Sequence, residues 1–267
     1  MPMDWLVLGT YALLGIFAGL MAGLLGIGGG LIIVPILLWL FSIQGHVPPE
    51  IAMQVAVGTS LATIILTSIG SIWSHHQKGA IDWLIVQRIL LGLLLGSVAG
   101  SVIAHYMPSD MLKKIFGVLQ IIIALNMALG GQPKPSRQLP GFVGMTGAGS
   151  VVGAISSLMG MGGGAVSTPF FAWCNVPMRR AIATSAAIGL PAAIAGSAAY
   201  VWTGYGLASL PPMSLGYVYL PAWLSIGVMS IVFAVLGAKL THILPVDILK
   251  KVFAVLLLVL GIKMLFF

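Results

Sequence analysis

Gly26-Ile27-Gly28-Gly29-Gly30 returns 134 positions later in the chain as Gly160-Met161-Gly162-Gly163-Gly164. A proline follows five residues after each motif, at Pro35 and Pro169. Three consecutive glycines form a poor helix and leave backbone groups unpaired. In lipid, such backbone is tolerated only where protein or a cavity surrounds it. The two motifs therefore predict a duplicated chain, with a helix broken at the glycines of each half.

Other matched residues extend the repeat. Thr59-Ser60 matches Thr184-Ser185, and a Pro-x-Asp-x-Leu-Lys-Lys segment at 108–114 returns at 245–251. The proline-containing polar stretch between the halves is typical of a linker. We therefore expect three parts: a first transmembrane repeat at 1–131, a linker at 132–140 and a second transmembrane repeat at 141–267.

Composition indicates a membrane protein. Only 6% of the 267 residues are charged, 59% are hydrophobic and the mean hydropathy is +1.11, whereas about 25% of a soluble domain is charged. So few charges could not cover the surface of a soluble protein of this size. The net charge of +7 fits cytoplasmic loops and lipid headgroups. Membrane lipid is therefore an expected partner, and nucleic acid is not.

Each half divides into five apolar segments. They cover residues 5–25, 31–42, 51–74, 83–104 and 111–130, then 141–159, 165–175, 181–202, 215–240 and 247–267. A membrane-spanning helix needs about 20 apolar residues, so the short second segment of each half can either span or re-enter. The sequence predicts an all-α polytopic protein with 8–10 transmembrane segments.

Basic residues favour an inverted relation between the halves. With five passes per half, nine basic residues lie on one side and three on the other; with four passes, the division is seven against five. Cytoplasmic loops carry the excess of Lys and Arg. We therefore expect inverted repeats, with both termini outside the cytoplasm.

A repeated break in a membrane helix is the best sequence indication of a transporter site. Helix N-termini and glycine N–H groups suit an anion, and no charged residue falls in the middle of an apolar segment. Hydroxyls often bond back to their own helix, but a pair that recurs in both halves also suits a ligand. The expected substrate-binding residues are Gly28, Gly29, Gly30, Thr59, Ser60, Gly162, Gly163, Gly164, Thr184 and Ser185. Gly92, Gly96 and Gly100, spaced four apart, instead suit close helix packing.

Other chemistries find little support in the sequence. The single cysteine, Cys174, excludes an internal disulfide. The histidines lack the helical spacing of a metal site and lie at segment ends, so we expect neither a bound metal nor a cofactor. Catalysis by a nucleophile would need a Ser or Cys with a His at mid-depth. We therefore do not expect an enzyme.

The duplicated Gly-x-Gly-Gly-Gly motif, the Thr-Ser pair and the Pro-x-Asp-x-Leu-Lys-Lys segment resemble the sulfite exporter TauE/SafE family of membrane permeases. The resemblance covers essentially the whole chain. It implies transport of small anions, chiefly sulfite, sulfoacetate and related organosulfonates, across the bacterial cytoplasmic (inner) membrane.

We expect the two halves to share a midplane site and to expose it by alternating access. The alternatives are an anion channel on the same scaffold and a membrane scaffold subunit that transports nothing. A cation or metal permease is disfavoured, because buried acids are missing from the segments. Assembly as a homodimer is left open.

Overall fold

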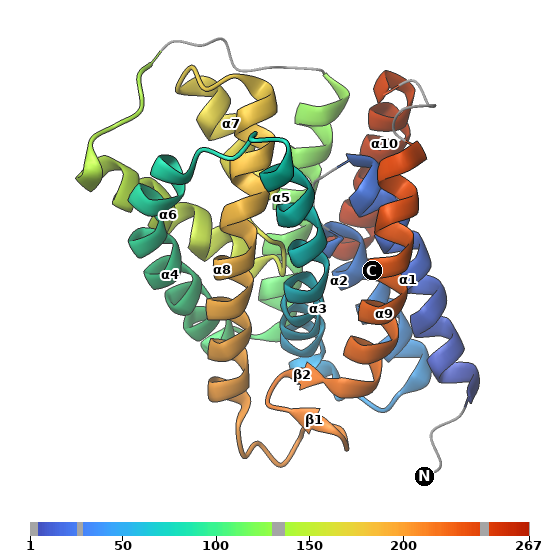
Figure 1. The fold of residues 1–267 in the computed structure, drawn as a ribbon. Helices are drawn as coiled ribbons and strands as arrows, with labels where there is room; N and C mark the ends of the chain where they lie inside the picture. Colours follow the sequence, from blue (N-terminus) through green and yellow to red (C-terminus); the bar gives the residue numbers. More distant parts are fainter. Residues whose placement is uncertain (1–4, 26–28, 130–136, 241–245, 267) are drawn as a thin grey trace.

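The computed structural model describes residues 5–25, 29–129, 137–240 and 246–266, and for Leu25, 238–240 and 246–250 it describes the backbone only. These ranges form ten helices and one short β-hairpin (Figure 1). The first half holds α1 (Trp5–Leu25), α2 (Gly30–Gln44), α3 (Pro49–Gln77), α4 (Trp83–Tyr106) and α5 (Ser109–Ala128). The second half holds α6 (Phe142–Leu158), α7 (Gly164–Trp173), α8 (Met178–Gly204), β1 (Ser214–Leu215), β2 (Val218–Tyr219), α9 (Leu220–Leu240) and α10 (Val246–Phe266).

The helices confirm an all-α polytopic membrane protein. Within the described ranges, six helices are long and apolar enough to cross a membrane, namely α1, α3, α4, α5, α8 and α9. Helices α2, α6 and α7 are shorter, with 15, 17 and 10 residues. The number of crossings and the division into two repeats stay predictions, and residues 132–136 of the expected linker lie outside the described ranges.

Glycines let two pairs of helices approach closely. A Cβ atom at Gly92, Gly96 or Gly100 of α4 would lie 1.8–2.6 Å from a backbone oxygen of α6, so a side chain there would force the two backbones apart. This contact confirms the packing role that their spacing predicts. Gly15 and Gly19 of α1 lie equally close to the backbone of α9. Each of these contacts joins the two halves of the chain.

Helices α3 and α8 cross the middle of the protein and run in opposite directions (Figure 1). The tenth residue after the start of α3, Thr59, accepts a hydrogen bond from Tyr219, which lies beyond the end of α8. Near the start of α8, Thr184 accepts one from Asp82, beyond the end of α3. Opposite directions are what an inverted relation requires, although the inverted repeat itself stays a prediction.

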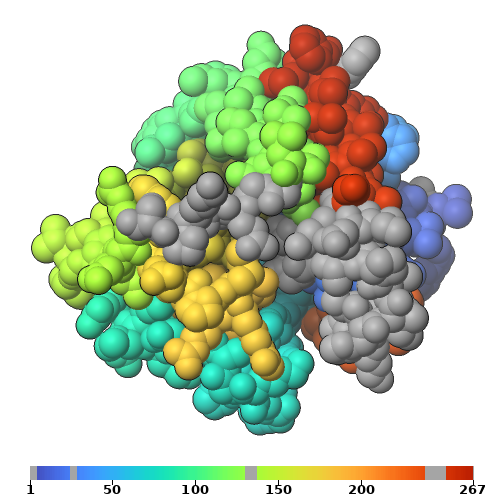
Figure 2. Space-filling view, turned by 90° about the horizontal axis from the view of Figure 1, so that it is seen from above, coloured from blue at the N-terminus to red at the C-terminus, as the bar shows by residue number. Residues whose placement is uncertain are grey.

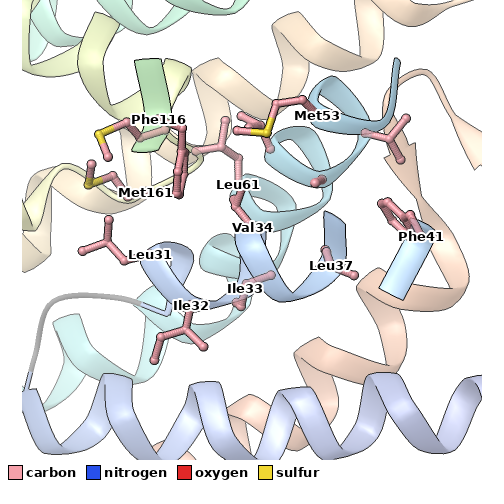
Figure 3. Packing of buried hydrophobic residues seen from close by; sticks show 14 of the residues in the cluster. Leu31, Ile32, Ile33, Val34, Leu37, Phe41, Met53, Leu61, Phe116 and Met161 are labelled. Atoms are coloured by element: carbon pink, nitrogen blue, oxygen red, sulfur yellow. The ribbon is translucent and has the colours of Figure 1, made fainter. Parts of the chain in front are cut away.

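The largest hydrophobic cluster surrounds α2, which is buried among other helices. Figure 3 shows Leu31 and Val34 of α2 close to Leu61 of α3 and Phe116 of α5, with Leu37 further along α2. All five side chains are fully buried. The short apolar helix thus lies against protein, where a helix that ends inside the membrane can be accommodated.

The helix expected at 215–240 begins later in the structure than the sequence predicted. Residues 214–219 form an antiparallel hairpin in which Ser214 pairs with Tyr219, and α9 begins only at Leu220. Gly216 has a φ of +54°, a left-handed conformation that glycine adopts readily and that ends regular helix. Tyr217, Val218 and Tyr219 are buried, so the hairpin is packed inside the protein.

Candidate functional site

The second glycine motif forms a bend between α6 and α7. Gly160 and Gly163 have φ values of +61° and +78°, in the left-handed region that side chains other than glycine rarely occupy. The Gly163 carbonyl then accepts hydrogen bonds from the N–H groups of Val166 and Ser167, at 3.1 and 2.9 Å, which starts α7. The repeated glycines therefore place a helix N-terminus inside the protein.

The first glycine motif ends at the N-terminus of α2. The Gly29 carbonyl accepts hydrogen bonds from the N–H groups of Ile32 and Ile33, at 3.0 and 2.9 Å, and both Gly29 and Gly30 are buried. Gly28, also expected to bind substrate, lies outside the described residues.

The two motifs meet at Gly30. A Cβ atom on Gly30 would lie 2.1 Å from the Gly160 oxygen and 2.9 Å from the Met161 Cα. Since these atoms are backbone, no side chain could be accommodated without moving the chain. The structure therefore brings the N-terminus of α2 against the bend that leads into α7.

Helices α3 and α8 border the second motif on two sides. The Ser60 hydroxyl of α3 donates a hydrogen bond to the Gly160 oxygen at 2.7 Å. From α8, a Cβ atom at Gly189 would lie 2.5 Å from the Gly162 oxygen. The second motif is thus held between the first half's α3 and the second half's α8.

Ser185 reaches the second motif through Ser167 of α7. The Ser167 hydroxyl lies 2.8 Å from the Ser185 hydroxyl and also donates to the Gly163 oxygen at 2.9 Å. Both serines are buried. Six of the ten predicted site residues therefore lie in one neighbourhood, namely Gly30, Ser60, Gly162, Gly163, Gly164 and Ser185; Gly29 adjoins them at the start of α2.

Thr59 and Thr184 point to other partners. The Thr59 hydroxyl oxygen accepts the Tyr219 N–H at 3.0 Å, and the Thr184 hydroxyl oxygen accepts the Asp82 N–H at 3.0 Å. Both threonines are fully buried. For neither hydroxyl proton does the described part of the chain show an acceptor, so each group keeps one donor that an anion could use.

Among the residues that the structure describes, none places a charged side chain in the site. Among the described residues, the buried polar side chains are all uncharged Ser, Thr and Gln, and no group of three His, Cys, Asp or Glu residues could hold a metal ion there. The positive potential comes instead from the N-termini of α2 and α7, each equivalent to about half an elementary charge. Such a neighbourhood suits a small anion held by N–H and O–H donors.

Two contributing polar residues were not predicted from the sequence. Ser167 bridges Gly163 and Ser185, and its spacing of four from Gly163 is the signal that could have indicated it. Gln120 of α5 donates to the Leu31 oxygen at 3.3 Å. In a regular helix the Leu31 carbonyl would accept the N–H of the residue four positions on, but that residue is Pro35, which has no N–H. The Gln120 side chain supplies the missing donor, so this polar residue has a structural role in the apolar helix α5.

Comparisons with known proteins find similarity along nearly the whole chain. The family model described as sulfite exporter TauE/SafE matches residues 11–264. A protein of Haemophilus influenzae named "Probable membrane transporter protein" is 38% identical over 257 residues, covering 94% of this chain and 96% of that protein. "Probable membrane transporter protein MJ0441" of Methanocaldococcus jannaschii is 30% identical over 265 residues, covering 97% and 96% of the two chains. No solved structure matches.

Proposed function

Because the chain belongs to the sulfite exporter TauE/SafE family of membrane transporters, we propose that it moves sulfite or a small organosulfonate such as sulfoacetate. The observation that carries this proposal is the meeting of Gly30, at the start of α2, with Gly160–Met161, just before α7. Two helix N-termini with neighbouring hydroxyls can replace the hydration of an oxyanion. A buried cation in their place would remain without a counter-ion.

We assign the substrate to Gly28–Gly30, Gly162–Gly164 and the hydroxyls of Thr59, Ser60, Thr184 and Ser185. Thr59 lies ten residues into α3, about 15 Å from the start of the helix at 1.5 Å per residue. This is about half of the hydrocarbon thickness of roughly 30 Å. The site is therefore proposed at the membrane midplane, between the halves, where movement of one half against the other exposes it alternately to each side.

We place the protein in the bacterial inner membrane with both termini outside the cytoplasm. Three exposed basic residues lie at one end of the protein, next to the last residue of α3 and the first residues of α8: Lys78, Arg179 and Arg180. Asp82 lies at the same end, between α3 and α4. An excess of basic residues belongs on the cytoplasmic side. Labelling of engineered terminal cysteines by a membrane-impermeant maleimide in intact cells tests this orientation, in a chain whose Cys174 is replaced by alanine.

Binding is tested first by thermal stabilisation of the purified protein with sulfite, thiosulfate, sulfoacetate, taurine, sulfate and acetate. A ligand that binds only the folded state stabilises it by about 2.7 kcal/mol at a concentration of 100 Kd. Ser60→Ala, which releases the Gly160 oxygen from its hydrogen bond, and Ser185→Ala should weaken the effect. Thr63→Val is the matched control, since the Thr63 hydroxyl bonds to Thr59 O within its own helix at 2.9 Å.

Flux into proteoliposomes then separates the mechanisms. Saturable uptake that is accelerated by the same anion on the opposite side supports alternating access. Non-saturating flux with single-channel conductance would instead indicate that the protein is an anion channel. A folded protein that binds and moves none of the six anions would favour the scaffold subunit and overturn the proposed function.

A further inference from the structure

Two hydrogen bonds join the halves of the chain at corresponding places. Thr59 of the first half accepts the Tyr219 N–H of the second half, and Thr184 of the second half accepts the Asp82 N–H of the first, each at 3.0 Å. The partners are 160 and 102 residues apart in the sequence. These bonds are therefore part of how one half is held against the other.

The two bonds are equivalent in position as well as in chemistry. Each threonine precedes a serine in the central helix of its half, α3 or α8. Each donor is the residue immediately before a membrane helix of the opposite half, since Asp82 precedes α4 and Tyr219 precedes α9. If each threonine only satisfied a nearby backbone N–H, the same bond would have no reason to occur twice, with the acceptor in the first half in one case and in the second half in the other.

We propose that Thr59–Tyr219 and Thr184–Asp82 are two latches that close the paths from the site to opposite faces of the protein and open one at a time. This inference rests on the proposed alternating-access cycle. Figure 1 shows the hairpin that carries Tyr219 at the lower end of α8 and α9. Figure 2 looks onto the opposite face, where the segment around Asp82 lies beside the start of α8.

Both latches are formed in this conformation, so both faces are closed at these points. Each half-cycle then requires one bond to break, and a buried N–H or hydroxyl left unpaired opposes that opening. An anion that accepts the free hydroxyl proton would polarise the hydroxyl and strengthen its acceptance of the N–H. Thr59 and Thr184 thereby link occupancy of the site to closure of the faces.

The two latches differ in their surroundings. The Tyr219 ring packs edge-on against Tyr11 and Phe41, with ring centroids 6.1 Å apart in both pairs. Its neighbour Tyr217 bonds through its hydroxyl to His105 at 2.9 Å. The Asp82 carboxylate, by contrast, caps the first turn of its own helix α4. We expect the Thr184–Asp82 latch to open more readily.

Hydrogen exchange of the full chain in lipid nanodiscs, resolved to single amides, measures each latch directly because the donors are backbone N–H groups. Thr59→Val should accelerate exchange at Tyr219 roughly three- to tenfold, the ratio expected for one ordinary hydrogen bond, without changing Asp82. Thr184→Val should do the reverse. Thr59→Ser and Thr184→Ser retain the hydroxyl and should restore protection, while Thr63→Val should change neither amide.

The outcomes separate the latches from the transport proposal. Unchanged exchange in both valine variants, or equal acceleration at both amides in either one, would overturn the latches. A protein that moves none of the six anions would overturn the transport function and, with it, the latch cycle that rests on that function, whatever the exchange pattern. Anion flux that is unaffected by the valine variants would show that neither bond controls access, and would also overturn the inference.

Discussion

Replacing Gly30 by alanine would force a methyl group into the contact between the two glycine motifs. The methyl carbon would lie 2.1 Å from the Gly160 oxygen and 3.0 Å from the Gly160 carbonyl carbon. To reach an ordinary carbon contact distance of about 3.5 Å, the bend must move by more than 1 Å. Alanine is otherwise the better helix former, so any destabilisation comes from this contact.

The expected loss has two parts. Overpacking of a dense interior costs about 1–3 kcal/mol. The displaced Gly160 oxygen also accepts the Ser60 hydroxyl at 2.7 Å, and loss of that bond costs about 0.5–1.5 kcal/mol. We expect Gly30→Ala to lower the free energy of unfolding by about 2–4 kcal/mol and to weaken anion binding.

Thermal and denaturant unfolding of the purified variant measures the first effect, and anion-dependent stabilisation measures the second. Gly9→Ala is the matched control, because Gly9 is a helical glycine near the start of α1 whose Cβ would meet nothing within 4 Å. It should leave stability unchanged or raise it by up to about 1 kcal/mol.

A double-mutant cycle that combines Gly30→Ala with Ser60→Ala can refute the proposed displacement of the Gly160 oxygen. If the methyl group displaces the Gly160 oxygen, Ser60→Ala should cost less in the Gly30→Ala background than in the original chain. Strict additivity would show that the Ser60 bond survives. A Gly30→Ala protein as stable as the Gly9→Ala control would refute the claim that the two motifs are in backbone contact.

Three other changes test the packing and the charges. Gly96→Ala should destabilise the protein by about 1–3 kcal/mol, seen as a lower unfolding midpoint, because its Cβ would lie 2.0 Å from an α6 backbone oxygen. Gln120→Leu should leave the Leu31 oxygen unpaired and cost about 1–3 kcal/mol, and Pro35→Ala should reduce that cost by supplying an N–H within α2; equal losses in both backgrounds would contradict the pairing. Burial lowers the pKa of His46, between α2 and α3, so its contribution to stability is present above the ordinary value of about 6.5 and is lost as the pH falls toward the lowered value. His46→Gln should therefore reduce the pH dependence of the free energy of unfolding between pH 7.5 and 5. An unchanged pH dependence in this variant would show that His46 is not its source.

Much of the helical architecture could be predicted because lipid imposes it on the sequence. The apolar segment 83–104 corresponds to α4 at Trp83–Tyr106, and 111–130 corresponds to α5 at Ser109–Ala128. Long apolar stretches bounded by polar residues leave few alternatives to a spanning helix. The hairpin at 214–219 escaped prediction because it runs directly into the apolar residues of α9, and only the nearby Pro211-Pro212 and Gly216 indicated a turn.

The site was harder to predict, because its contacts depend on how the halves are placed. Repetition suggested that Ser60 and Ser185 act alike, and both do reach the second glycine motif, through Gly160 and Ser167 respectively. Nothing in the spacing shows that Ser60 of the first half contacts the motif of the second half. Nor does it show that Thr59 and Thr184 accept the backbone N–H groups of Tyr219 and Asp82, since those partners lie more than 100 residues away.

The close packing of α1 against α9 also sets the timing of assembly during synthesis. The Ser230 hydroxyl donates to the Gly15 oxygen at 3.0 Å across 215 residues. A ribosome that adds about 5–20 residues per second needs roughly 10–40 s to make that stretch. The first helix to enter the membrane therefore waits for nearly the whole chain before its principal partner exists. Until then the glycine face of α1 is open to lipid, to chaperones and to wrong partners.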